Sequence, residues 1–132
     1  MKLDESVARA CERIPGMLRG ALVLLPDGIL LSRIGGESAL DLEPLIRAAT
    51  RCFHERVLPA LGAIARWPQQ PFLEYLFVID DQLVVIQGGR RDPRLALAVA
   101  CTRDHTVGFV LTAARLAMLD LEEEIDLSAW GL

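Results

Sequence analysis

The sequence predicts an α+β domain with a single five-stranded antiparallel sheet and helices packed on it, in the order α-β-β-α-β-β-β-α. Two observations predict the sheet: two pairs of apolar runs are each joined by a short polar turn, and a fifth run alternates large apolar residues with alanine. A third predicts the helices, because three segments place apolar residues three and four positions apart. The 132 residues suit one domain, residues 1–132, with a core of its own.

The first third of the chain predicts a short helix followed by a hairpin. Residues 3–13 carry apolar side chains at helical spacing until Pro15-Gly16 interrupts the pattern. Residues 17–25 form a nearly unbroken apolar run, which is typical of a strand covered on both faces. Pro26-Asp27-Gly28 then returns the chain onto a strand at residues 29–33, because proline suits the second position of a turn and glycine tolerates positive φ.

A long helix is predicted next, with Ser38 or Asp41 as its cap. Its apolar stripe consists of Leu42, Leu45, Ile46, Ala49, Phe53 and Val57. Pro59 lacks an amide donor and crowds the preceding turn, so we expect the helix to kink or restart there and to end toward Trp67-Pro68. We expect its exposed face to carry Arg47, Arg51, His54 and Glu55.

A second hairpin is predicted from residues 72–79 and 83–87, joined at Asp80-Asp81-Gln82. Leu73, Tyr75, Phe77 and Ile79 share one side of the first of these strands, whereas Glu74 interrupts the other side. The polar loop at residues 88–93 separates this hairpin from the next strand.

Residues 95–101 predict the central strand of the sheet. Leu95, Leu97, Val99 and Cys101 alternate with Ala96, Ala98 and Ala100, so the large and the small side chains take opposite faces. A face made of alanine lets a helix lie close against the sheet. We therefore place this strand centrally, under helices.

The last helix is predicted to begin at Asp104 or Thr106. The residues expected to face inward are Val107, Val110, Leu111, Ala114, Met118 and Leu121. Glu122-Glu123-Glu124 falls at the negative end of the helix dipole, which disfavours carboxylates, so we expect residues 122–132 to form a frayed tail. An acidic docking tail is the functional alternative for the same residues.

Composition excludes several classes of function. Aromatic residues make up only 5%, and 14 Lys and Arg stand against 18 Asp and Glu, which argues against nucleic-acid binding. The N-terminus turns acidic at once and lacks the apolar segment of a signal peptide, and no run is long enough to insert into a membrane, so we expect a cytoplasmic protein. Cys11, Cys52 and Cys101 form no C-x-x-C pair, which favours reduced, mostly buried thiols.

An ordered set of short motifs resembles the roadblock family: the dynein light chains and their bacterial relatives, which include the gliding-motility partner of a Ras-like GTPase. The matching pieces are Ile14-Pro15-Gly16, Pro26-Asp27-Gly28, the helix from Asp41, the strands at 72–79, 83–87 and 95–101, and Thr106-Val107-Gly108. They cover nearly the whole chain. The resemblance implies a profilin- or longin-like sheet in a non-enzymatic homodimer, which joins its sheets at the third strand, packs its long helices across a twofold axis and serves as a platform for small GTPases or motor complexes. Pro59 and the connection at residues 66–71 depart from the family pattern.

The residues themselves agree with a homodimer. The apolar strand at residues 72–79 would invite aggregation as a bare edge, and pairing with its own copy removes that exposure. Small side chains on the long helix, including Ala49, permit a close approach of two helices, and Arg51 with Glu55 can pair within one helix or across to a partner. The predicted dimer interface consists of Ala48, Cys52, Phe72, Leu73, Glu74, Tyr75 and Phe77. The predicted GTPase-binding positions are Arg47, Arg51, His54 and Glu55.

Motifs for catalysis, cofactors or metals are weak by comparison. Gly35-Gly36 lacks the remaining glycines and the lysine of a nucleotide-binding loop. Arg90-Arg91 beside two glycines suggests phosphate binding, with an ordinary hairpin loop as the favoured alternative. Cys101 and His105 have no evident third group to orient them, and two distant histidines give no metal pattern. We therefore expect no catalytic residue, no cofactor and no metal.

The sequence thus favours a non-catalytic homodimeric regulatory or scaffold protein that binds a small Ras-like GTPase. The GTPase comes from the resemblance alone. The alternative is a small-ligand sensory module of PAS- or profilin-like architecture, and a thiol hydrolase ranks third. A sensor needs a polar-lined cavity between sheet and helix, whereas the alanine face at residues 95–101 predicts that this gap is filled.

Overall fold

The computed structural model describes residues 2–25, 28–35, 41–64 and 74–126. Its helices are α1 (Lys2–Cys11), α2 (Leu42–Cys52), the π-helical η2 (Phe53–Val57), α3 (Leu58–Ile64) and α4 (Val107–Glu124). Its strands are β1 (Met17–Leu24), β2 (Ile29–Ile34), β3 (Glu74–Ile79), β4 (Gln82–Gly88) and β5 (Leu95–Thr102). The predicted α+β class and order of elements are confirmed.

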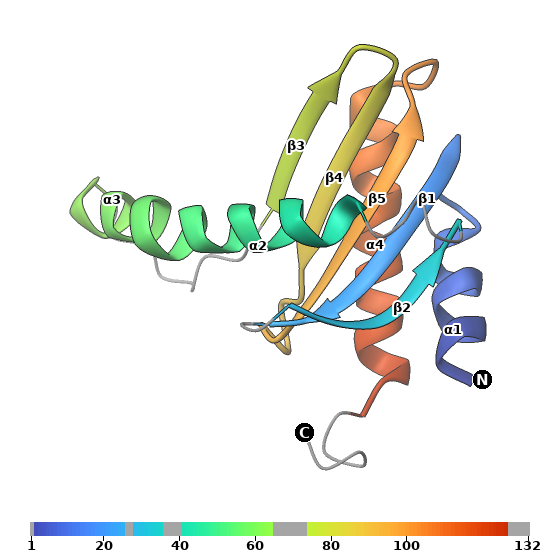
Figure 1. Ribbon diagram of the computed structural model, residues 1–132, viewed down its shortest axis with the longest axis horizontal. Coiled ribbons are helices and arrows are strands. Elements are labelled where there is room, and N and C mark those ends of the chain that lie inside the picture. Colours follow the sequence, from blue (N-terminus) through green and yellow to red (C-terminus); the bar gives the residue numbers. More distant parts are fainter. Residues whose placement is uncertain (1, 26–27, 36–40, 65–73, 127–132) are drawn as a thin grey trace.

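The five strands form one antiparallel sheet in the order β2-β1-β5-β4-β3. The two hairpins therefore lie on either side of β5, which occupies the predicted central position. β2 and β3 are the two edges of the sheet (Figure 1). In the first hairpin, Gly28 takes the positive φ expected of it, +73°, and its amide donates to the Leu24 carbonyl over 3.0 Å.

Helices cover both faces of the sheet and create two separate cores (Figure 1). On one face, α1 and α4 pack on the large side chains of β5, such as Leu97 and Val99. On the other face, α2 crosses the strands above Ala96, Ala98 and Ala100. All of these β5 side chains are buried. The alternation of large and small residues along one strand thus separates the two cores, as predicted.

The long helix follows its predicted stripe closely. Leu42, Ile46, Ala49 and Phe53 are buried against the alanine face, and Leu45 and Val57 pack at its margins. Asp41 stands at the start of α2, but its side chain makes no capping hydrogen bond. Burial of the stripe therefore stabilises this helix without a hydrogen bond from Asp41, and Ser38, the alternative cap, lies outside the described residues.

Pro59 changes the helix without ending it. η2 ends two residues before the proline. The Leu58 amide donates to the Phe53 carbonyl, five residues back. Such π-turns insert an extra residue into a helix and often mark a strained position. The expected kink or restart therefore takes the form of a π-helical segment, and α3 continues past the β3 edge of the sheet (Figure 1). The end predicted near Trp67-Pro68 lies outside the described residues.

One expectation about α4 is corrected. Val107 is exposed rather than inward-facing, because the first turn of α4 extends beyond the sheet side chains that cover its later turns. The helix is assigned through Glu124, and the expected fraying from residue 122 stays a prediction. Residues 127–132 of the predicted tail are outside the described part of the chain.

We predict that Ala98→Leu lowers the free energy of unfolding by about 1 to 3 kcal/mol, the usual effect of overpacking a filled core. The Ala98 side chain lies buried between the sheet and α2, so a larger group must push the helix away. Urea denaturation measures the change. Ala8→Leu, at an exposed position of α1, is the matched control and should change stability by no more than about 0.5 kcal/mol. Equal stability of the two variants would contradict the close-packed alanine face.

Candidate functional site

β3 presents an apolar edge of the sheet to solvent. Leu76, Val78 and Ile79 are 36%, 57% and 49% exposed, and β3 has β4 as its neighbour on one side only. The register pairs Leu76 with Val85 and Val78 with Leu83. Leu76 and Val78 therefore lie on the same face of the sheet as α4, but α4 does not cover them. Among the described strands, β3 has a partner on one side only and carries apolar side chains, the two properties of an edge that can pair.

The opposite side of β3 faces the long helix. Tyr75 and Phe77 stack with ring centroids 5.9 Å apart and pack against the α2 core. The Tyr75 hydroxyl is enclosed beside Cys52, and removal from water, followed by the neighbouring thiol, raises the pKa of Tyr75 to about 12. This contact shows that the flank of α2 that carries Cys52 faces the β3 edge.

The remaining predicted interface residues divide into three groups. Ala48 and Cys52 are exposed on α2, as an interface between two helices requires. Glu74 is already paired within the protomer, because its carboxylate accepts hydrogen bonds from Arg115 Nε at 2.6 Å and Arg115 Nη2 at 2.8 Å. Phe72 and Leu73 lie outside the described residues.

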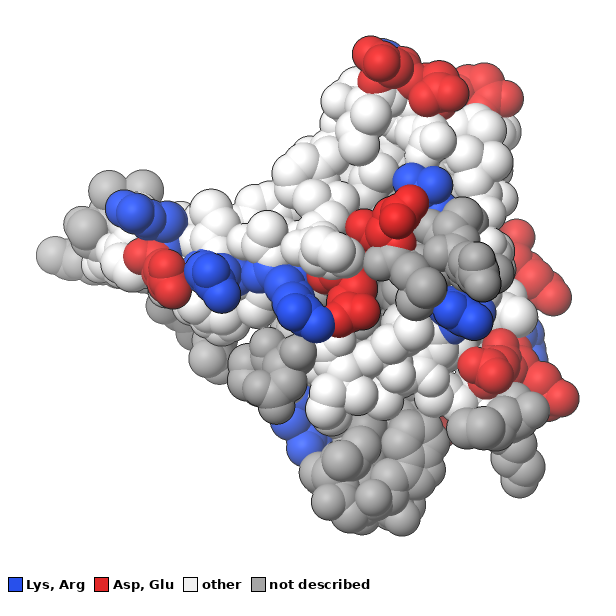
Figure 2. All heavy atoms as spheres, viewed as in Figure 1, with Lys and Arg blue, Asp and Glu red and all other residues white. Residues whose placement is uncertain are grey.

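All four predicted partner-binding residues are exposed on the long helix. Arg47 forms an ion pair with Glu43 one turn earlier, and His54 places its ring edge-on to Phe53, with ring centroids 5.7 Å apart. Arg51 and Glu55 complete the set. Figure 2 shows basic and acidic side chains following one another along this helix. The prediction of a charged outer face is therefore confirmed, whereas its role in binding stays a prediction.

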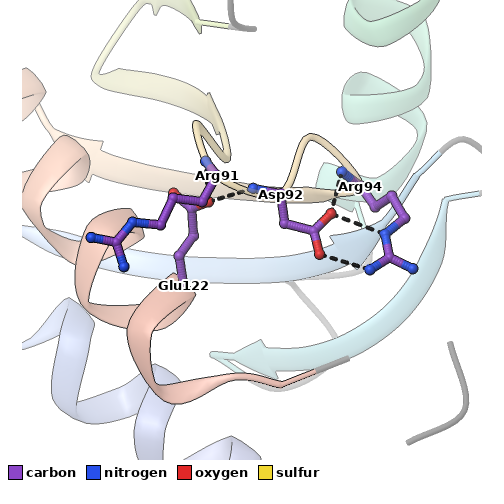
Figure 3. A network of polar contacts seen from close by, with 4 residues as sticks. All are labelled: Arg91, Asp92, Arg94 and Glu122. Atoms are coloured by element: carbon purple, nitrogen blue, oxygen red, sulfur yellow. Dashed lines mark hydrogen bonds and ion pairs between the residues drawn. The ribbon is translucent and has the colours of Figure 1, made fainter. Parts of the chain in front are cut away.

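The amides of the Arg90-Arg91 loop already bind a carboxylate of the same chain. The backbone amides of Arg90, Arg91 and Asp92 donate to the Glu122 carboxylate over 3.0, 2.7 and 2.8 Å. Figure 3 draws Arg91, Asp92 and Glu122 of this network. Asp92 in turn accepts hydrogen bonds from Arg94, which lowers the pKa of Asp92. These amides are therefore engaged by a carboxylate of α4, which favours the reading of an ordinary structural loop over a phosphate site.

Two of the three thiols are removed from solvent. Cys11 and Cys101 are buried, and loss of hydration raises the pKa of Cys11 to about 12 and that of Cys101 to about 11. Cys52 is exposed, so two of the three thiols are buried, in agreement with the expectation of mostly buried thiols. His105 is exposed beside Asp104, 3.8 Å away, while Cys101 is buried in the sheet. No thiolate and imidazole are thus brought together here for nucleophilic chemistry.

Neither a metal cluster nor a membrane span occurs in the part of the chain that the structure describes. Within those ranges, no three His, Cys, Asp or Glu side chains are grouped so as to hold a metal ion. No helix in the same ranges is both long and apolar enough to cross a membrane.

The sequence matches no protein-family model and none of the curated proteins. Solved structures match over nearly the whole chain. A Roadblock/LC7 domain from Streptomyces avermitilis is 15% identical with a TM-score of 0.69, covering 92% of this chain and 95% of its own. This chain has the roadblock fold. MglB from Myxococcus xanthus is 17% identical with a TM-score of 0.66, covering 94% of both chains, and the gliding protein MglB from Thermus thermophilus is 17% identical with a TM-score of 0.64, covering 95% and 94%.

Within this roadblock fold, the sequence missed the long-range polar contacts. Glu122 and its loop lie about thirty positions apart in the chain, and Glu74 and Arg115 are 41 apart.

We predict that Glu122→Gln lowers the free energy of unfolding by about 1 to 2 kcal/mol, because charge-assisted hydrogen bonds to backbone amides are stronger than neutral ones. Glu123→Gln is the control, since Glu123 has only an exposed ion pair with Arg91 at 3.7 Å. Thermal and urea denaturation measure both variants. If Glu123→Gln destabilises the protein as much as Glu122→Gln, the loop is not held by the Glu122 carboxylate.

The thiols give a second prediction. In a Cys52→Ser variant, iodoacetamide at pH 8 should alkylate Cys11 and Cys101 far more slowly than it does in the same variant unfolded in urea. Their raised pKa values leave little thiolate, and burial blocks access. Mass spectrometry follows the reaction. Rapid alkylation of Cys101 in the folded protein would instead indicate a reactive thiol and revive the hydrolase alternative.

Proposed function

We propose that this roadblock-fold domain is a non-catalytic, cytoplasmic, homodimeric regulator or scaffold that binds a small Ras-like GTPase. The observation that carries the proposal is the exposed apolar edge of β3, next to a long helix with a charged outer face. A second copy covers the edge, and the GTPase contacts the helix. These two parts rest on different residues and are tested separately.

The dimer part follows from β3. Natural sheets protect their edges with charge, proline or a covering segment, yet Leu76, Val78 and Ile79 are apolar and solvent-facing in the protomer. Antiparallel pairing of β3 with β3 of a second copy forms one continuous ten-stranded sheet and buries these side chains on both copies. Such an isologous contact closes after two subunits and therefore stops growth.

The position of the long helix fits the same arrangement. The flank of α2 that carries Cys52 faces the β3 edge, as its contact with Tyr75 shows. α3 continues past that edge, over the space that a partner's sheet occupies in the proposed dimer (Figure 1). Ala48 and Cys52 offer small side chains to the second long helix. The dimer thus combines a sheet contact with a helix contact.

The GTPase part rests on the outer face of α2 and on the resemblance. Arg47, Arg51, His54 and Glu55 are exposed in the protomer and belong to a helix whose opposite stripe is buried. Arginine suits protein interfaces because its planar fork contacts carboxylates while its stem covers apolar surface. The similar solved structures include gliding proteins, and one is described as MglB with a tetrameric arrangement.

We predict that Val78→Lys raises the Kd of the homodimer by about tenfold or more, because a lysine must lose hydration on a paired edge. Val78 is 57% exposed in the protomer, so the fold itself should tolerate the change. Ile29→Lys, at the 51% exposed first residue of the other edge strand β2, is the matched control and should leave the Kd unchanged. Sedimentation equilibrium measures both. A monomeric native protein at micromolar concentration, or equal effects of the two lysines, would contradict β3 pairing.

We predict that Arg47→Glu with Arg51→Glu abolishes capture of a small GTPase while dimerisation and melting temperature change little. A modest, salt-dependent loss would place the two arginines at the rim of the interface. The control, Arg9→Glu on α1 with Arg13→Glu in the turn that follows it, changes the net charge equally on the opposite face of the sheet and removes exposed ion pairs with Glu124 and Asp120. If the control variant also loses GTPase capture, the loss in the α2 variant comes from the change in net charge and not from the α2 surface. Dissociation of the dimer by the α2 pair would assign this helix face to the dimer instead.

A further inference from the structure

The residues of β3 select one register for contact with a second copy. Given the β3 pairing of the proposed function, the residue on the twofold axis follows from the strand itself. In an isologous contact each residue meets the residue at the mirror position of the second copy, so the residue on the axis decides every other pair. The backbone and the side chains of β3 limit this choice independently.

The hairpin geometry of β3 shows which of its backbone groups point toward a second copy. Ile79 pairs with Gln82 across a two-residue turn, so this closing pair is hydrogen-bonded. Bonded pairs alternate along an antiparallel ladder, so β4 engages the odd-numbered residues of β3. The amides and carbonyls of Glu74, Leu76 and Val78 therefore point outward. Residues of this outward set must meet one another across the interface, which places the twofold axis on a residue and not between two residues.

Apolar side chains occupy the last five positions of β3. The strand reads Glu-Tyr-Leu-Phe-Val-Ile, and its one charge is at Glu74, the first residue. Leu76, Val78 and Ile79 are exposed in the protomer, so these three side chains gain most from cover. The centre of the apolar stretch is Phe77. An axis through Phe77 is therefore the one position at which every residue of the stretch has an apolar mirror image.

We propose that the two copies pair antiparallel with Phe77 on the twofold axis. Leu76 then faces the partner's Val78 in two bonded pairs, on the α4 face of the sheet. Phe77 meets its own counterpart on the α2 face, in a non-bonded pair, where opposite side chains lie closest. Tyr75 faces the partner's Ile79 on the same face, an aromatic ring against a β-branched side chain. Because Phe77 and Tyr75 pack against the α2 core, the α2 cores of the two copies join into one.

An axis on a neighbouring residue places charge or the turn against apolar side chains. An axis on Leu76 puts Glu74 opposite the partner's Val78, and an axis on Tyr75 puts it opposite the partner's Leu76. An apolar cover over this carboxylate removes water from its ion pair with Arg115 without adding a polar partner. An axis on Val78 shortens the paired stretch and brings Leu76 against the polar β3–β4 turn.

The charges at the ends of the strand agree with an axis on Phe77. Glu74 then lies beyond the apolar stretch, level with the partner's Asp80. Each of these two residues is held by an arginine of its own protomer. Arg115 donates to the Glu74 carboxylate over 2.6 and 2.8 Å. Arg103 Nη1 donates to the Asp80 carbonyl over 2.6 Å. Two arginines thus accompany the two carboxylates at each end of the interface and offset their repulsion.

An isotope-filtered nuclear Overhauser experiment on the native full chain tests the register without any mutation. In a mixture of carbon-13-labelled and unlabelled protein, the filter selects contacts between copies. The Cα atoms of a non-bonded antiparallel pair are only about 4.5 Å apart, so their Hα atoms lie close together. An axis on Phe77 predicts a contact between Tyr75 Hα and the partner's Ile79 Hα. A contact between Tyr75 Hα and the partner's Phe77 Hα would place the axis on Leu76 and overturn the proposal.

Cysteine cross-linking tests the same register at two exposed positions. In a Cys52→Ser background, Leu76→Cys and Val78→Cys chains are mixed, allowed to exchange and treated with oxidised glutathione. Position 76 lies directly opposite position 78 of the partner, whereas two copies of the same position lie diagonally, about 7 to 8 Å apart, which is too far for a disulfide. The mixture should therefore cross-link at least about tenfold faster than either variant alone. Equal or faster cross-linking of Leu76→Cys alone would overturn an axis on Phe77.

Sedimentation equilibrium of the native chain separates failure of the register from failure of the dimer. A dimer that shows the contact between Tyr75 and the partner's Ile79 supports both. A dimer that shows a contact between Tyr75 and the partner's Phe77 agrees with β3 pairing but contradicts the axis. A dimer with no contact between the two β3 strands, or a monomer, contradicts both.

Discussion

The close contact between α2 and the alanine face of β5 is the constraint on which the rest of the molecule depends. Ala96, Ala98 and Ala100 leave no large side chain between the central strand and the helix, so Ile46 and Phe53 reach the sheet directly. The large side chains of the same strand supply the other core, under α1 and α4. One alternating strand therefore determines both the layer order and the distance at which the long helix crosses the sheet.

Two consequences for interaction follow from this packing. Because its buried stripe is narrow, the long helix keeps a broad charged face in solvent, with Arg47 and Arg51 on it. Because α4 lies over β4 and β5, it leaves Leu76 and Val78 of the edge strand uncovered. The same geometry fills the gap in which a PAS-like sensor would hold its ligand.

Much of the fold was predictable from short-range patterns. The period-two alternation at residues 95–101 located the central strand, and the helical stripe from Leu42 located the face of α2 that is buried. The charged outer face of α2 could be predicted for the same reason, since a helix buried on one side exposes the other. Each of these signals lies within one element and needs no knowledge of what packs beside it.

The features that the sequence did not reveal depend on residues that are distant in the chain. The Glu122 contact with the β4–β5 loop and the Glu74–Arg115 pair require the assembled fold. Near Pro59 the helix can either break or widen one turn into a π-turn. Burial of Phe53 and packing of Val57 favour the π-turn, which keeps the helix continuous.

Amide hydrogen exchange in β3 tests the central claim most directly. Alternate amides of Glu74–Ile79 point away from β4, and pairing with a second copy gives each of them an acceptor. The account predicts that these outward amides are protected at high protein concentration, lose protection on dilution, and remain slower than the outward amides of the other edge strand, β2. Outward β3 amides that exchange as fast as those of β2 at every concentration would contradict it.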